Sequence, residues 1–104
     1  MTTNQYHEPA AELSPEIRTF ARMIAGLIEE AEAIGWYEQR LSVETNDDAK
    51  AIMKNAQQEE FKHFGMDLEF LLRGKQEWRA ILQRILFTDG DIVKIAEKAE
   101  EIAK

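Results

Sequence analysis

The sequence predicts an all-α protein, and three observations lead to that class. Apolar residues recur at intervals of three and four along two long segments, which is the spacing of an amphipathic helix. No segment shows the alternation of apolar and polar residues that is typical of a strand. The 104-residue chain is 44% hydrophobic and has only five glycines and two prolines, so we expect no linker between folded domains.

The first long helix is expected over residues 14–42, after an irregular N-terminal arm formed by residues 1–13. Ser14 and Pro15 mark its start, because serine caps the first turn and proline fits the first helical position. Apolar residues then recur on one face of this helix: Ile17, Phe20, Ile24, Leu27, Ala31, Ile34 and Leu41.

A second long helix is expected over residues 47–73. Asn46 or Asp47 can cap its start, while Arg73 and Gly74 supply a basic last turn and a glycine stop. Its apolar face consists of Ala49, Ile52, Met53, Ala56, Phe70 and Leu71. Because only a short polar segment separates the two long helices, we expect them to form an antiparallel hairpin.

Two shorter segments complete the chain. A third helix is expected over residues 77–87, and the turn Thr-Asp-Gly-Asp leads into a charged, weakly amphipathic C-terminal segment over residues 92–104. No internal repeat stands out. We therefore expect residues 1–104 to form a single all-α domain.

Charge and composition exclude several classes of function. The net charge of −7, from 13 Lys+Arg and 20 Asp+Glu, disfavours nucleic acids and anionic membranes as partners and favours cations. With no cysteine, any metal would be bound by carboxylates, imidazole or water. The first residues form no apolar signal segment, and no run of about 18 apolar residues occurs, so we expect a cytoplasmic protein.

A carboxylate and a histidine lie on the apolar face of the second long helix. At 100° per residue, Glu60 and His63 fall about 40° and about 20° from the direction of Ala56, which lies in the apolar stripe. We therefore expect both side chains to point into the core. A buried carboxylate needs a cation, a hydrogen-bond partner or an opening to solvent. His63 follows Glu60 by one helical turn, so both can reach one ion.

Glu30 lies at the edge of the apolar face of the first helix. One Glu on a helix and Glu-x-x-His on its antiparallel neighbour make up half of the constellation that binds two iron ions in four-helix bundles. No second Glu-x-x-His occurs, because the other histidine, His7, lies in the arm. A complete site therefore requires two chains related by a two-fold axis. Carboxylates and neutral imidazole suit iron that cycles between Fe(II) and Fe(III).

Some apolar residues lie off the two main stripes and predict a second apolar surface. They are Trp36 on the first helix and Phe61, Leu68 and Leu72 on the second. Either the third helix or a further subunit covers this surface. We favour the subunit and expect a homo-oligomer.

Other interpretations of Glu60 and His63 remain open at this point. Glu-x-x-His arises by chance in a Glu-rich chain, and a core histidine can simply bond to Glu60 or to a glutamate of another chain. The chain would then be a non-catalytic helical oligomerisation or adaptor module. A helical protein that binds manganese or zinc structurally is a third alternative. Metal content and oxygen consumption with Fe(II) would separate these classes.

Three segments together resemble the encapsulated ferritins, which are ferritin-like proteins packaged inside encapsulin nanocompartments: LIEEAEAIGWYEQR, NAQQEEFKHFGMDLEFLLR and LFTDG. The resemblance covers residues 7–92, in order and at consistent spacing. It implies a ferroxidase whose two-helix hairpin dimerises into a ferritin-like four-helix bundle and whose dimers close into an annular decamer. Oxidised iron would be deposited in the lumen of the encapsulin shell.

The resemblance also assigns roles to particular residues. The ligands of the di-iron centre would be Glu30, Glu60 and His63. The aromatic pair beside that centre would be Trp36 and Tyr37. The acidic residues along the path by which metal enters would be Glu29 and Glu32.

The sequence departs from the family pattern in two places. The family has an outer metal site of one His and two Glu, where this chain has Glu59 with Asn55 and Lys62, so we expect that site to be weakened or absent. Asp67 falls on the ligand face, about 20° from the direction of Ala56, where a neutral residue is expected. It can act as an extra polar group that supports the ligands. No segment up to Lys104 is recognisable as the family's C-terminal targeting peptide.

Overall fold

The computed structural model describes residues 6–103, and every regular element in that range is helical. A short 3-10 helix, η1 (Ala10–Glu12), precedes four α-helices: α1 (Pro15–Val43), α2 (Asp47–Arg73), α3 (Gln76–Ile85) and α4 (Ile92–Ala103). The all-α prediction is therefore confirmed for the described residues. Residues 1–5 of the expected arm, and Lys104, lie outside them. No helix in the described range is long and apolar enough to cross a membrane.

Local capping fixes the start of α1. The backbone N–H of Ile17 donates a hydrogen bond to Oγ of Ser14 at 3.2 Å, which satisfies one of the free donors of the first turn. Arg18 then donates from Nε to the backbone carbonyl of Ala10 at 3.0 Å. This bond links the N-terminal arm to the first turn of α1.

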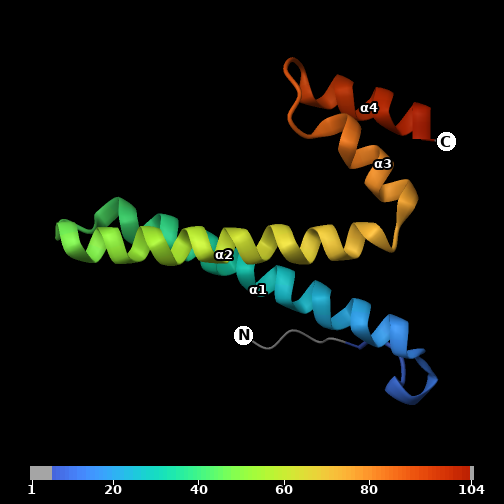
Figure 1. Cartoon of the computed structure of the whole chain (residues 1–104), viewed down its shortest axis with the longest axis horizontal. Helices are drawn as coiled ribbons and strands as arrows, with labels where there is room; N and C mark the ends of the chain where they lie inside the picture. The colour runs from blue at the N-terminus through green and yellow to red at the C-terminus, as the bar shows by residue number, and fades with distance from the viewer. Residues whose placement is uncertain (1–5, 104) are drawn as a thin grey trace. The chain divides into compact units, whose positions relative to one another are not determined.

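The turn between α1 and α2 reverses the chain, so the two long helices run in opposite directions (Figure 1). Asn46 caps α2, because its Oδ1 accepts a hydrogen bond from the N–H of Ala49 at 2.9 Å. Further along, Nε2 of Gln57 donates to the backbone carbonyl of Ile34 at 3.2 Å and to the Glu38 carboxylate at 2.7 Å. These cross-helix bonds set the register of the hairpin.

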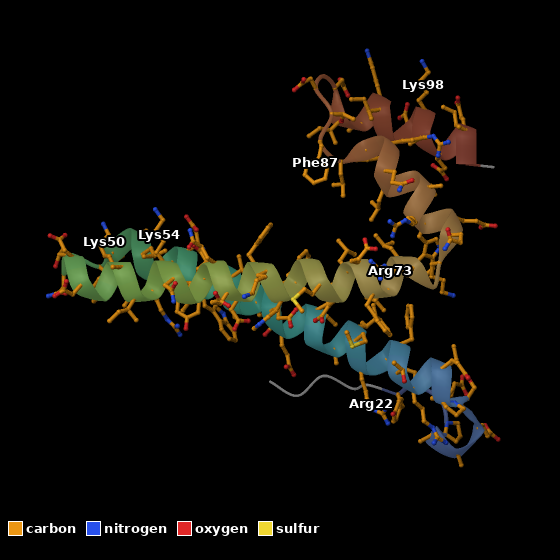
Figure 2. The ribbon with its side chains drawn as sticks, in the orientation of Figure 1. Arg22, Lys50, Lys54, Arg73, Phe87 and Lys98 are labelled. Atoms are coloured by element: carbon orange, nitrogen blue, oxygen red, sulfur yellow. The ribbon has the colours of Figure 1, made fainter. Side chains whose placement is uncertain are left out.

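The contacts of the chain group it into two units, Met1–Leu71 and Leu72–Lys104. In the second unit α3 and α4 pack against each other. Helix α3 ends at Ile85 rather than near Phe87, because the backbone is already extended at Leu86. Phe87, which follows, has a left-handed backbone with φ of 63°. The Phe87 side chain is fully exposed (Figure 2).

The described part of the chain has almost no core of its own. Only Leu71 and Ala99 are buried among its apolar residues. The apolar stripes are not fully buried in the isolated chain, since Ile52 and Phe70 are 71% and 51% exposed. One antiparallel helix can cover only part of a neighbour's apolar face. The uncovered part is available for contact with another chain.

Candidate metal centre

The hairpin brings three carboxyl groups together from two helices. Glu30 lies near the middle of α1, while Glu60 and Asp67 lie two helical turns apart on α2, and all three side chains are partly buried. Asp67 acts on Glu30 as a hydrogen-bonding group and as a charge, and Glu60 acts on it as a charge; all of these effects raise the pKa of Glu30. The effect of Glu60 on Glu30 agrees with a juxtaposition of the two across the hairpin, which stays a prediction.

The environment of Glu30 disfavours a negative charge there. Burial, hydrogen bonding with Asp67 and the charges of Asp67, Glu60 and Glu29, in that order of importance, together raise the pKa of Glu30 from its usual 4.5 to about 7. Oε2 of Glu30 is also buried and has no hydrogen-bond partner among the described residues. A buried acceptor without a partner is unfavourable. A cation at this oxygen would remove that cost.

His63 does not point into the hairpin. Its side chain is exposed, so the expectation that it faces the core of the chain is wrong for a single chain. Glu60, on the same helix, is partly buried, and one neighbouring helix can cover only part of the α2 face. Among residues 6–103 no three His, Asp or Glu side chains are grouped closely enough to hold a metal ion.

The aromatic and acidic residues assigned by resemblance lie along the same stretch of α1. Tyr37 is partly buried, and the Arg40 guanidinium lies 5.2 Å from the centroid of its ring. Trp36 is 52% exposed. Of the two acidic residues, Glu29 is exposed and Glu32 is partly buried.

The Glu59 carboxylate is paired with a lysine side chain. Its carboxylate forms an exposed salt bridge with Nζ of Lys62 at 2.9 Å. The hydrogen bond and positive charge of Lys62 hold the pKa of Glu59 below its usual value. A lysine that already pairs with this carboxylate competes with any cation, which fits the expectation of a weak outer metal site.

Two residues that shape the site were not identified from the sequence. Gln57 sets the helix register, and Gly26 leaves space on α1 for Asp67, since a Cβ at Gly26 would lie 3.2 Å from Oδ2 of Asp67. A glycine inside a helix is a signal of close approach, because it costs about 1 kcal/mol relative to alanine. The sequence pattern gave no comparable signal for Gln57.

The hairpin also has an open groove of about 400 Å³ near its turn. Lys50 and Lys54 line it from α2, with both side chains on the same side of that helix (Figure 2). None of the predicted ligands lines this groove. It is therefore separate from the carboxylate cluster.

The structure shows an all-helical protein, with the partly buried carboxyl groups of Glu30, Glu60 and Asp67 on a two-helix hairpin. This chain belongs to the EncFtn-like family, whose model matches residues 5–89. The resemblance to encapsulated ferritins noted from the sequence motifs is thereby confirmed.

Two curated relatives support the same assignment. The chain is 39% identical over 95 residues to a protein of Thermotoga maritima named "Ferritin-like protein", covering 91% of this chain and 83% of the relative. It is 37% identical over 94 residues to the "Encapsulated ferritin-like protein" of Rhodospirillum rubrum, covering 90% and 67% respectively. Membership of a ferritin-like family points to an iron-related function.

A solved structure shares the fold. The crystal structure of protein ne0167 from Nitrosomonas europaea matches with a TM-score of 0.79 and 38% identity. The match covers 84% of this chain and 96% of that one.

Proposed function

We propose that this protein is a ferroxidase, which oxidises Fe(II) to Fe(III) with dioxygen at a di-iron centre shared by two chains. The observation that carries the proposal is the buried, unpartnered Oε2 of Glu30, on a carboxyl that lies near Glu60 from the neighbouring helix. Groups of this kind are usual at functional sites, where a bound cation offsets the repulsion between carboxylates.

The shared site follows from what one chain lacks. Within the described residues a single hairpin offers Glu30 and Glu60 together, but His63 is exposed and no complete ligand group forms. A two-fold axis beside this face would bring a second copy of each residue to the same centre. The result would match the four-helix arrangement of two lone Glu and two Glu-x-x-His that binds two metal ions.

The residues fit iron. Carboxylate oxygens and imidazole suit hard and borderline ions, and a chain without cysteine offers no thiolate to favour softer ones. When bound, a pair of iron ions would supply the electrons that dioxygen accepts. Glu60 would bridge the ions, Glu30 would be a second carboxylate ligand, and His63 would bind through a ring nitrogen. Trp36 and Tyr37 would lie beside the centre, while Glu29 and Glu32 would attract Fe(II) towards it.

Assembly is part of the proposal. A chain in which Leu71 and Ala99 alone are buried among the described apolar residues cannot offset its conformational entropy with its own core. We propose that two chains form a ferritin-like four-helix bundle and that these dimers close into an annular decamer. The assembly would reside in the cytoplasm, inside an encapsulin shell that receives the oxidised iron, for storage and detoxification.

The test compares the iron oxidation rates of variants at the predicted ligands with that of a variant at a neighbouring glutamate. Glu60→Ala and His63→Ala each remove two ligands from a two-fold site, so both should abolish most Fe(II) oxidation. Glu59→Ala is the matched control, because Glu59 is exposed and paired with Lys62, and it should retain the parent rate. The measurements are the initial rate of Fe(III) formation and the assembly state of each variant. If Glu60→Ala and His63→Ala assemble and oxidise iron at the parent rate, the chain is an oligomerisation module instead.

A further inference from the structure

The Asp67 carboxyl lies close to α1 at Gly26, where a side chain on α1 would crowd it. A Cβ at Gly26 would lie 3.2 Å from Oδ2 of Asp67, which is closer than ordinary van der Waals contact. Gly35 on α1 and Gly65 on α2 have nothing within 4 Å of the same position. Gly26 is therefore the glycine of the hairpin helices whose missing side chain leaves room for a neighbour, and that neighbour is the Asp67 carboxyl.

The same carboxyl reaches Glu30. Gly26 precedes Glu30 by one helical turn on α1, so a group that lies over Gly26 is beside the Glu30 side chain. Asp67 is near enough to raise the pKa of Glu30 by hydrogen bonding and by charge. Oε2 of Glu30 is buried and has no hydrogen-bond partner among residues 6–103, so that oxygen is uncommitted.

Asp67 also belongs to the ligand face of α2. It follows Glu60 by seven residues and His63 by four, which places the three on one side of the helix. It is partly buried, whereas His63 is exposed. Asp67 is therefore placed to contact Glu30 on the side away from the shared centre.

We propose that Asp67 is a positioning residue of the metal centre: seated against Gly26, it holds the Glu30 carboxyl so that its buried, unpartnered oxygen is free to bind the cation. This inference rests on the proposed function, because Glu30 must be a ligand. Groups that orient metal ligands in this way typically change metal affinity 10- to 100-fold when they are removed.

The experiment measures binding of Co²⁺, which is inert to dioxygen under the conditions used and reports its ligands through visible absorption. The assembled parent is compared with Asp67→Ala, Asp67→Asn and Gly26→Ala. Gly35→Ala is the matched control, since it makes the same change on the same helix in open space. Thermal unfolding in a chelator is recorded for every variant.

We expect Asp67→Ala and Gly26→Ala to weaken Co²⁺ binding about 10- to 100-fold and to alter its spectrum. Asp67→Asn keeps the shape and a hydrogen-bonding group and should recover part of the affinity. Gly35→Ala should bind like the parent. The unfolding temperature in the chelator should not fall in step with the affinity. A purely structural role of Asp67 would instead lower the unfolding temperature and leave the affinity unchanged.

The proposal is overturned if Asp67→Ala and Gly26→Ala bind Co²⁺ as tightly as the parent and Gly35→Ala, or if they lose stability with unchanged affinity. The Glu60→Ala variant shows whether the positioning role of Asp67 alone is wrong or whether the proposed metal centre is wrong as well. If Glu60→Ala loses Co²⁺ and Asp67→Ala does not, only the positioning role is wrong. If the parent and Glu60→Ala bind Co²⁺ equally, or not at all, the metal centre itself is wrong and both proposals fall.

Discussion

Gln57 on α2 donates one amide group to two acceptors on α1, the backbone carbonyl of Ile34 at 3.2 Å and the carboxylate of Glu38 at 2.7 Å. Gln57 precedes Glu60 by one helical turn, so this pair of bonds fixes which part of α1 lies opposite the candidate ligands. The register of the hairpin, and with it the approach of Glu30 to Glu60, depends on a polar contact outside the carboxylate cluster.

Gln57→Ala should destabilise the hairpin without touching a ligand. A hydrogen bond within a protein contributes about 1 kcal/mol, so the loss of two should lower the free energy of unfolding by about 1–2 kcal/mol. Urea denaturation followed by circular dichroism measures this. Gln58→Ala, at an exposed neighbouring position, is the control and should unfold like the parent.

How far the sequence predicts this molecule can be judged from particular residues. Ser14 and Asn46 act as the caps that the sequence indicated, because capping depends only on residues within one turn. The approach of Glu30 to Glu60 was also predictable from helical spacing and an antiparallel hairpin. The exposure of His63 was not, since periodicity shows which face of a helix is apolar and not how much of it the neighbouring helix covers.

The contact between Asp67 and Glu30 could not be predicted from either helix alone. Asp67 was identified as a polar residue on the ligand face, but its partner depends on the cross-helix register and on the space at Gly26. Similarly, α3 ends where Leu86 becomes extended, and Phe87 then adopts a left-handed backbone that an aromatic residue rarely adopts. Such features arise from tertiary packing and not from local propensity.

Without metal, the parent should become less stable as pH rises, because the Glu30 carboxyl loses its proton. The pKa of Glu30 is about 7 in the folded chain, above its usual 4.5. The folded state therefore binds this proton more tightly, and the stabilisation is complete below pH 4.5 and lost as pH rises through about 7. Urea unfolding at several pH values in a chelator tests this. Glu30→Gln cannot titrate, so it should lose the part of the pH dependence that lies between these two values; an identical pH profile would contradict the assignment.

Glu29→Ala and Glu32→Ala should slow the arrival of Fe(II) without damaging the centre. The effect is electrostatic and long-range, so it should be largest at low ionic strength and should vanish near 1 M salt, where the Debye length is about 3 Å. Stopped-flow rates of Fe(III) formation across a salt series measure it. The amount of iron bound at saturation should match the parent. A rate deficit that persists at high salt would make these residues ligands.

Phe61→Ser should weaken assembly while the helices remain. Phe61 is 63% exposed in the single chain and stacks on Phe64 with ring centroids 6.1 Å apart. Burial of a phenylalanine side chain contributes about 1.5–3 kcal/mol, so its loss at an interface should raise the dissociation constant about tenfold or more. Sedimentation velocity gives the distribution of species, and circular dichroism confirms that the helical content is kept. An unchanged distribution would exclude this surface from the interface.

The central claim is that two chains complete one iron site, and anaerobic titration with Fe(II) followed by native mass spectrometry tests it most directly. The chains should bind two iron ions per pair, in dimers or larger species, and single chains should carry none, because one hairpin holds no complete ligand group within its described residues. Added iron should also shift the population from single chains to assemblies. Iron bound to single chains at the same ratio, or dimers that take up no iron, would contradict the shared centre.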